Sequence, residues 1–122
     1  MAWDKRTFRE LATDREIDVV VPAPDRAAIR TTVWPVAVDG EVYVRSWKGE
    51  AGRWYRRARR TGAGAVVTGT GRHEVRFVPV AGADLDAAID REYLRKYRRS
   101  SYAAAMTRPP AAGTTLRLDP AE

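Results

Sequence analysis

The chemistry that the sequence best supports is anion binding by a run of basic residues between positions 45 and 60. One acidic residue, Glu50, accompanies seven basic ones there: Arg45, Lys48, Arg53, Arg56, Arg57, Arg59 and Arg60. A glycine-bearing loop, 47–52, leads into a predicted short helix, so free amides and the positive end of a helix dipole lie beside arginines that can chelate phosphate. The segment therefore predicts a site for a phosphate-bearing partner.

The spacing along the predicted helix, 53–60, divides these basic residues between two roles. Trp54 and Ala58 share one helix face, which we interpret as the buried one. Arg53 and Arg57 lie closer to the predicted site and are expected to contact phosphate. The other arginines of the helix are interpreted as a solvated face: Arg56, Arg59 and Arg60.

The residue types required by several other chemistries are missing or isolated. The sequence contains no cysteine, which excludes a thiolate nucleophile, a disulfide and a thiolate zinc site. Its one histidine, His73, is interpreted as an ordinary hairpin residue, because no metal-ligand spacing surrounds it. Acidic residues near a helix start complement its dipole, which we prefer as the role of Asp84, Asp86, Asp90 and Glu92. We predict no metal site, leave the catalytic residues unknown, and expect any catalysis to depend on a cofactor.

An antiparallel hairpin is predicted immediately before the basic segment. Strands at 29–38 and 41–46 flank Asp39-Gly40, a strong signal for a type I′ turn, because both central residues of that turn need a positive φ. Pro35 lacks a backbone donor and is expected at a sheet edge or at a bulge. The second strand of the hairpin ends where the basic segment begins.

The remaining elements predict an α+β protein, and its length is typical of one domain, 1–122. Periodicity and turn residues predict a helix that begins near Asp4 or Thr7, with a capping box formed by Thr7 and Glu10, and that ends at 12–14. Further strands are expected at 17–21, 65–68, 72–80 and 114–118, and a helix capped by Asp84 is expected to run to about Tyr97. About six strands in consecutive hairpins favour an antiparallel barrel or a strongly bent sheet.

Composition limits the partners of the chain. The net charge of +6 comes mostly from arginine, which favours an anionic partner but also suits a GC-rich genome. No apolar run approaches the roughly 20 residues that span a bilayer, and the charged start lacks the apolar stretch of a signal peptide. We therefore expect a cytoplasmic protein that does not bind a membrane.

The order of these features resembles the bacterial family called domain of unknown function 2255 (DUF2255). It is also similar to the split-β-barrel group of flavin- and deazaflavin-dependent nitroreductases and pyridoxamine-phosphate oxidases. The matching segments are Arg30-Thr31-Thr32 through Val38, the Asp39-Gly40 turn, Glu41 through Ser46, Ser46-Trp47-Lys48-Gly49 and Gly52-Arg53-Trp54-Tyr55-Arg56. The likeness covers about 16–80, and the later helix and the strand at 114–118 also resemble the DUF2255 family.

The resemblance implies a split β-barrel of about six strands, with an N-terminal helix, a short helix after the third strand and a C-terminal helix. It also implies a homodimer that binds flavin mononucleotide (FMN) or a deazaflavin. In that group the strand pair and the following loop hold the cofactor phosphate. Carried over, the cofactor-binding residues are Arg30, Thr31 and Thr32 from one strand, Arg45, Ser46 and Lys48 from the next strand and loop, and Trp54 and Arg57 from the helix.

The chain departs from the deazaflavin enzymes at two positions. Those enzymes usually have a Gly-Arg-x-Ser/Thr-Gly run before the strand, where this chain has Pro24-Asp25-Arg26-Ala27-Ala28. They also tend to place a proline directly after the strand threonine, whereas here Pro35 follows Thr32 three positions later.

Three functions follow from these observations. The first is a phosphorylated-cofactor protein, a candidate small oxidoreductase, with anchors at Arg30, Ser46, Lys48 and Arg57 and an apolar wall of Trp34, Trp47 and Trp54. The second is a non-catalytic binding module that has kept the barrel and lost the cofactor. The third is nucleic-acid binding through 53–60 and 91–99, which is less favoured because acidic residues dilute the second stretch and no recognised motif is present.

Overall fold

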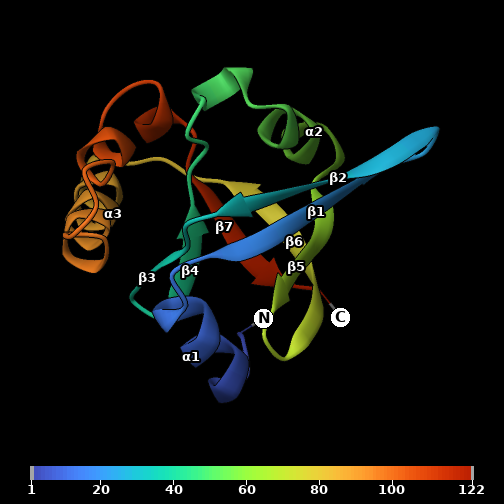
Figure 1. Ribbon diagram of the computed structural model, residues 1–122, viewed down its shortest axis with the longest axis horizontal. Helices are drawn as coiled ribbons and strands as arrows, with labels where there is room; N and C mark the ends of the chain where they lie inside the picture. Colours follow the sequence, from blue (N-terminus) through green and yellow to red (C-terminus); the bar gives the residue numbers. More distant parts are fainter. Residues whose placement is uncertain (1, 122) are drawn as a thin grey trace.

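The computed structural model describes residues 2–121 and shows an α+β fold in which an antiparallel sheet curls into a split barrel (Figure 1). In the order β2-β1-β5-β6-β7-β4-β3, seven strands form one sheet within the described residues. The strands are β1 (Ile17–Ala23), β2 (Arg26–Val33), β3 (Val36–Val38), β4 (Glu41–Val44), β5 (Ala63–Thr68), β6 (Gly71–Pro79) and β7 (Leu116–Pro120). The α-helices are α1 (Lys5–Thr13), α2 (Arg53–Thr61) and α3 (Ala83–Lys96), and three short 3-10 helices are η1 (Gly49–Ala51), η2 (Ala104–Thr107) and η3 (Ala111–Gly113).

The predicted β-hairpin is confirmed at β3 and β4. Asp39 has φ 50° and Gly40 has φ 81°, and Val38 pairs with Glu41 across this two-residue loop. Positive φ at both positions is what a type I′ turn requires, and it explains the choice of aspartate and glycine. The turn fixes the register of β4, the strand that leads directly into the basic segment.

The strand expected at 29–38 is two strands, β2 and β3, which are interrupted at Trp34 and Pro35. Strand β2 pairs with β1, whereas β3 pairs with β4, so the chain changes its neighbour at the break. Pro35 cannot donate to either ladder, and its carbonyl accepts hydrogen bonds from Tyr97 Oη at 2.9 Å and Lys96 Nζ at 2.5 Å. Both strands lie at the ends of the sheet order, which confirms the edge position expected for Pro35.

The helix boundaries follow their caps, with two corrections to the sequence analysis. The Asp4 side chain caps α1 by accepting from Thr7 N at 2.9 Å, so the expected capping box of Thr7 and Glu10 is wrong. Helix α2 ends at Gly62, whose φ of 71° is the left-handed conformation common at helix C-termini. The N-cap of α3 is Gly82, and Asp84 lies inside the first turn, where its charge complements the helix dipole.

Two apolar clusters lie on opposite faces of the strands near the hairpin. Val42 and Val44 of β4 join the cluster under α1 and α2, whereas Tyr43 joins a second cluster with α3 and 103–111. Successive side chains of β4 therefore point to opposite faces of the sheet and contribute to different clusters. In the second cluster Tyr93 and Tyr97 are buried. The Tyr93 hydroxyl donates to the Trp34 carbonyl, and the Tyr97 hydroxyl donates to the Pro35 carbonyl.

The helices cover different parts of the sheet, as Figure 1 shows. Helix α3 packs on β3, and α2 packs on β1 and β2. The β1–β2 hairpin extends beyond the other strands. No helix in the described part of the chain is long and apolar enough to cross a membrane.

Candidate functional site

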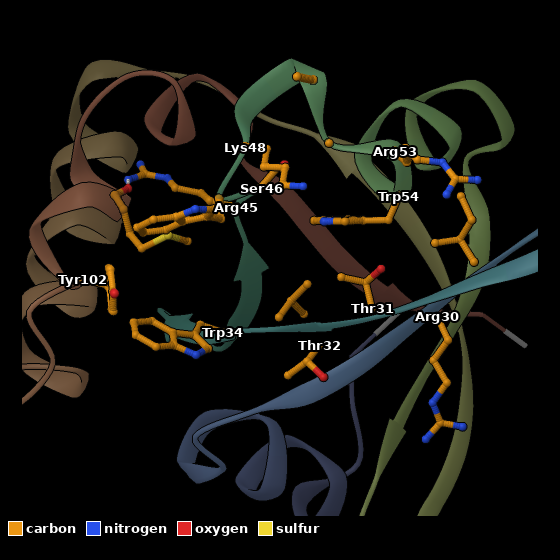
Figure 2. Close-up of a pocket in the computed structure, with 16 residues that line it drawn as sticks. Arg30, Thr31, Thr32, Trp34, Arg45, Ser46, Lys48, Arg53, Trp54 and Tyr102 are labelled. Atoms are coloured by element: carbon orange, nitrogen blue, oxygen red, sulfur yellow. Dashed lines mark hydrogen bonds between the residues drawn. The ribbon is translucent and has the colours of Figure 1, made fainter.

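A cavity of about 730 Å³ opens between β2, the loop at 46–52, the start of α2 and the segment 102–106 (Figure 2). Seven of the eight residues that the sequence analysis assigned to cofactor binding line it: Arg30, Thr31, Thr32, Arg45, Ser46, Lys48 and Trp54. The eighth, Arg57, lies elsewhere. We call this cavity the main pocket.

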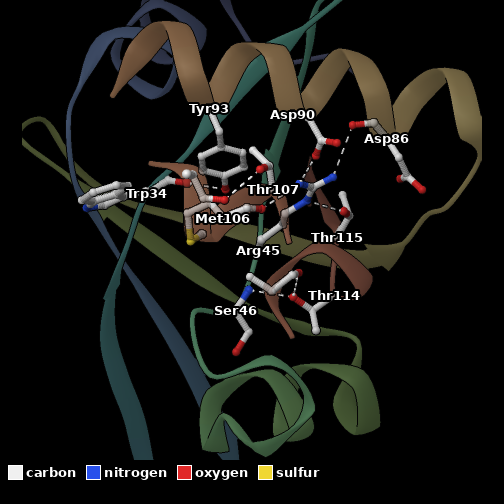
Figure 3. A network of polar contacts seen from close by, with 12 residues as sticks. Trp34, Arg45, Ser46, Asp86, Asp90, Tyr93, Met106, Thr107, Thr114 and Thr115 are labelled. Carbon is white, nitrogen blue, oxygen red and sulfur yellow. Dashed lines mark hydrogen bonds and ion pairs between the residues drawn. The ribbon is translucent and has the colours of Figure 1, made fainter. Parts of the chain in front are cut away.

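Ser46 carries the one fully buried side-chain polar atom in residues 2–121 that lacks a hydrogen-bond partner. The residue is 1% exposed, and its backbone N–H donates to Thr114 Oγ1 at 2.8 Å. Figure 3 shows the Ser46 side chain directed away from Thr114. Its Oγ lies against Gly52, where a Cβ would overlap it. An unpaired buried hydroxyl costs about 1–3 kcal/mol, and native proteins pair nearly all such groups.

The start of α2 adds free amides beside Ser46. Gly52 is the N-cap and offers no side-chain acceptor, and the first helical amide with a partner is that of Arg56, which donates to Gly52 O at 3.1 Å. The preceding amides of the helix have no intrahelical acceptor and lie at the positive end of the helix dipole. Exposed Lys48 and Arg53 also line the main pocket. This end of the pocket is therefore suited to an anion.

Arg45 lies at the main pocket, but its charge is directed away from it. The side chain is 0% exposed, and Nη1 contacts Asp90 Oδ1 at 2.5 Å and Met106 O at 2.8 Å. Its Nε donates to Thr115 Oγ1 at 2.9 Å (Figure 3). The expectation that Arg45 faces a phosphate is corrected, because its donors already join the residue after β4 to α3, Met106 and Thr115.

The three β2 residues assigned to the site are divided between two faces. Arg30 Nε donates to Asp18 Oδ2 at 2.7 Å, and Thr32 Oγ1 donates to Asp18 Oδ1 at 2.8 Å. These two hydrogen bonds lower the pKa of the Asp18 carboxyl. Thr31 alternates to the opposite face and points toward Trp54 in Figure 2. Of the three side chains, Thr31 is the one that faces the main pocket.

Arg57 is packed beneath the β1–β2 hairpin instead of at the main pocket. Its Nη1 donates to Ala27 O at 2.9 Å and to Val21 O at 3.3 Å, and the residue is 4% exposed. The expectation that Arg57 contacts the same phosphate as Ser46 is therefore corrected. The helix face that holds Trp54 and Ala58 packs on β1 and β2, and Arg57 lies on that packed face.

The apolar wall predicted from Trp34, Trp47 and Trp54 does line the main pocket. Trp54 also belongs to the buried core. Trp34 stacks on Tyr97, with ring centroids 4.2 Å apart. The wall thus combines a fixed ring, Trp34, with the exposed ring of Trp47.

Tyr102 and Met106 also line the pocket, and neither was assigned to it from the sequence. Tyr102 is 57% exposed and meets Trp47, 49% exposed, edge to face at 5.2 Å. Both missed residues lie in a segment that gave no periodic signal. Antiparallel pairing of β4 with β7 brings this segment to the pocket, and an exposed tyrosine is the only local signal for it.

The composition of the pocket limits its chemistry. Among the described residues that line it there is no aspartate, glutamate, histidine or cysteine, whereas several are basic or aromatic. No cluster of three such side chains suited to a metal ion occurs within residues 2–121. The pocket can bind an anionic, planar ligand, but its walls offer no carboxylate or imidazole for proton transfer.

Comparison with known proteins places the chain in a family. A family model described as "Uncharacterized protein conserved in bacteria (DUF2255)" matches residues 7–118. No curated protein matches the chain.

Solved structures share the fold at low sequence identity. ChuZ from Campylobacter jejuni has a TM-score of 0.70 at 6% identity, covering 94% of this chain and 50% of ChuZ. The conserved hypothetical protein Rv2991 from Mycobacterium tuberculosis has a TM-score of 0.65 at 12% identity, covering 97% of this chain and 79% of that one. A FAD-binding protein from Mesorhizobium loti has a TM-score of 0.54 at 12% identity, covering 98% and 91%. The chain spans about half the length of ChuZ, and at these identities the likeness is one of fold.

Proposed function

The chain belongs to the DUF2255 family, and we propose that its main pocket binds a phosphorylated flavin-type cofactor, FMN or a deazaflavin, as part of a small oxidoreductase. The observation that carries this proposal is the buried, unpartnered Ser46 Oγ beside the uncapped start of α2. A phosphate at this end of the pocket would meet the free amides of the helix, and a rotation of the Ser46 side chain toward it would give the hydroxyl an acceptor. The proposal is further supported by a solved structure of the same fold whose protein is described as FAD-binding.

The phosphate end of the ligand would be held by α2 and the preceding loop. Ser46 Oγ and the first-turn amides of α2 supply neutral donors, and Lys48 and Arg53 supply charge. Charge-assisted hydrogen bonds to phosphate are roughly twice as strong as neutral ones. We therefore assign phosphate recognition to Ser46, Lys48 and Arg53, and not to the side chains of Arg45 and Arg57.

The aromatic end of the ligand would lie along the other walls of the pocket. Trp34, Trp47 and Tyr102 present ring surfaces, and Thr31 provides a hydroxyl on the β2 side. Stacking and apolar burial suit a planar heterocycle. When bound, a flavin supplies hydride or electron transfer. The protein's role is then to bind and orient the ring, because no carboxylate or imidazole lines the described pocket.

We also propose that the chain forms a homodimer through the rim of the pocket. Trp47 and Tyr102 are large, exposed and in contact with one another. Exposed aromatic side chains of this kind are enriched at protein interfaces. Light scattering of the purified protein tests this, and a monomer at micromolar concentration would reject the dimer.

Nucleic-acid binding is less favoured because the basic residues do not form one surface. Arg45 and Arg57 are buried, and Arg59 donates to Tyr55 Oη at 2.9 Å. Two of the seven basic side chains between 45 and 60 are therefore buried within the protein, and a third is hydrogen-bonded to its own helix.

Direct titration tests cofactor binding. FMN, and separately a deazaflavin, is added to the protein while tryptophan fluorescence is recorded, since Trp34, Trp47 and Trp54 line the pocket. We expect saturable quenching with FMN or with the deazaflavin. Absence of saturable quenching with both ligands would reject the proposed cofactor, whereas binding without turnover would indicate the non-catalytic binding module.

A further inference from the structure

A second hollow, of about 390 Å³, lies between the tip of the β1–β2 hairpin and the C-terminal half of α2. Three arginines line it, Arg26, Arg57 and Arg60, together with one carboxylate, Asp25. Three cations and one anion leave a net positive charge at the hollow. We call this hollow the arginine hollow.

Arg57 is a buried cation without a carboxylate partner. It is 4% exposed, and within residues 2–121 no acidic side chain lies within ion-pair distance of it. Within residues 2–121 its side chain donates from Nη1 to the carbonyls of Val21 and Ala27. Burying an unpaired charge is costly, so a counter-charge at this position would stabilise the protein.

The remaining donors of Arg57 are free to meet a ligand. Nε and Nη2 make no hydrogen bond to the described residues, yet neither is sealed inside the protein, because Ser46 Oγ is the one sealed side-chain atom there without a partner. The two carbonyl contacts of Nη1 hold the guanidinium in place. A fixed guanidinium fork binds an oxyanion with little loss of conformational freedom.

Arg60 and Arg26 are the other two cations that line the arginine hollow. Arg60 is exposed, and within residues 2–121 its side chain makes no hydrogen bond and no ion pair. Arg26 is 3.7 Å from Asp25, but both side chains are largely exposed, with 67% and 80% of their surface accessible. Exposed ion pairs of this kind contribute little, so Arg26 can turn toward another anion at low cost.

We propose that the arginine hollow is a binding site for a phosphate-class oxyanion, separate from the main pocket and independent of the cofactor proposed there. Arg57 provides the fixed donors, and Arg60 and Arg26 provide mobile ones. The C-terminal end of α2 carries the negative end of the helix dipole, so attraction comes from the guanidinium groups alone. This predicts weak affinity that falls as ionic strength rises.

The experiment is a titration with inorganic phosphate, in which chloride is exchanged for phosphate at constant ionic strength. The reporter is the NMR signal of the Arg57 Nε–Hε group, which is local to the hollow. We expect a saturable shift of this signal and a rise in the melting temperature. No saturable shift would overturn the proposal and leave Arg57 as a clamp for the hairpin.

Variants separate the arginine hollow from general charge effects. Arg26→Ala combined with Arg60→Ala removes two exposed side chains, so the protein should fold, and phosphate affinity at the Arg57 signal should fall at least fivefold. Arg56→Ala combined with Arg76→Ala removes two exposed charges elsewhere and should change that affinity less than twofold. Equal losses in both double variants would overturn the site, since only a diffuse charge effect would remain.

Two further variants locate the anion. Ser46→Ala should leave the Arg57 titration unchanged, and loss of the shift in that variant would assign the anion to the main pocket instead. Arg57→Lys keeps the charge but removes the guanidinium fork, so phosphate should weaken at least fivefold as judged by the melting temperature. An undiminished phosphate effect in Arg57→Lys would contradict the assigned role of Arg57.

Discussion

Arg45 Nη1 lies 2.5 Å from Asp90 Oδ1, so a fully buried guanidinium just after β4 is bonded to a carboxylate on α3. The same nitrogen donates to Met106 O, which belongs to the far wall of the main pocket. Arg45 directly precedes Ser46 in the chain. The Arg45 side chain therefore connects the segment that carries Ser46 to α3 and, through Met106, to the opposite wall of the pocket. We assign it a positioning role and not a ligand-binding one.

Removing the carboxylate of this pair should be costly for stability. Asp90→Asn leaves the Arg45 charge buried without its anionic partner, so we expect the free energy of unfolding to fall by about 2–4 kcal/mol. Urea denaturation of the wild type and of the variant measures this change in the free energy of unfolding. The matched control is Glu92→Gln in the more exposed Glu92–Arg95 pair of the same helix, which should cost less than about 1 kcal/mol. Equal costs for both substitutions would contradict the structural role of Arg45.

Contact between Gly52 and Ser46 predicts a non-additive pair of substitutions. Gly52→Ala places a Cβ against Ser46 Oγ and should destabilise the protein by about 1–3 kcal/mol, as overpacking does. Ser46→Ala alone removes an unpaired hydroxyl and should leave stability unchanged or higher. In the double variant the Gly52→Ala cost should be smaller, because the overlapping oxygen is gone. A double-mutant cycle by urea denaturation checks this, and strict additivity would mean that the two groups are not in contact.

Lys96 should give stability a dependence on alkaline pH. Burial lowers the pKa of Lys96 to about 8, even though Asp14 and Glu92 act in the opposite direction. An unfolded lysine titrates near about 10.4. Between about pH 8 and pH 10 the unfolded chain thus binds more protons than the folded one, and the free energy of unfolding rises with pH. At higher pH the rise should reverse, because burial raises the pKa of Tyr93 and Tyr97, whose protons the unfolded chain releases first.

Lys96→Met tests that assignment. The variant should lose the rise in stability above about pH 8, while the carbonyl of Pro35 keeps the hydrogen bond from Tyr97 Oη. Lys5→Met, at an exposed position of α1, is the control and should keep the rise. Urea midpoints measured across this pH range distinguish them. A rise that persists in Lys96→Met would show that another group causes it.

Local sequence signals predicted the elements whose geometry is local. Asp39-Gly40 predicted a type I′ turn because both residues tolerate positive φ, and both have positive φ in the structure. The break at Trp34 and Pro35 depends on which strands become neighbours, and no single stretch of sequence encodes that choice. The result is two edge strands where one strand was expected.

The candidate site was predictable only in part, for a related reason. Helical spacing placed Arg57 close to the Trp54 face, but it could not tell whether its guanidinium meets solvent, a ligand or the carbonyls of Val21 and Ala27. Arg45 was assigned from the basic run and from the family resemblance, whereas its partner Asp90 lies far along the chain. Tyr102 reaches the main pocket through long-range strand pairing.

The central claim is a phosphate site at Ser46 and the start of α2, and the contribution of the ligand's phosphate to binding affinity tests it most directly. Affinities for FMN and for riboflavin, which lacks the phosphate, are compared by fluorescence titration in the wild type, in Lys48→Ala combined with Arg53→Ala, and in Arg56→Ala combined with Arg76→Ala. We expect FMN to bind at least about tenfold more tightly than riboflavin, or about 1.4 kcal/mol, in the wild type and in the Arg56/Arg76 control. In the Lys48/Arg53 variant this preference should fall to about twofold or less. Equal binding of FMN and riboflavin by the wild type would contradict a phosphate site at Ser46 and the start of α2.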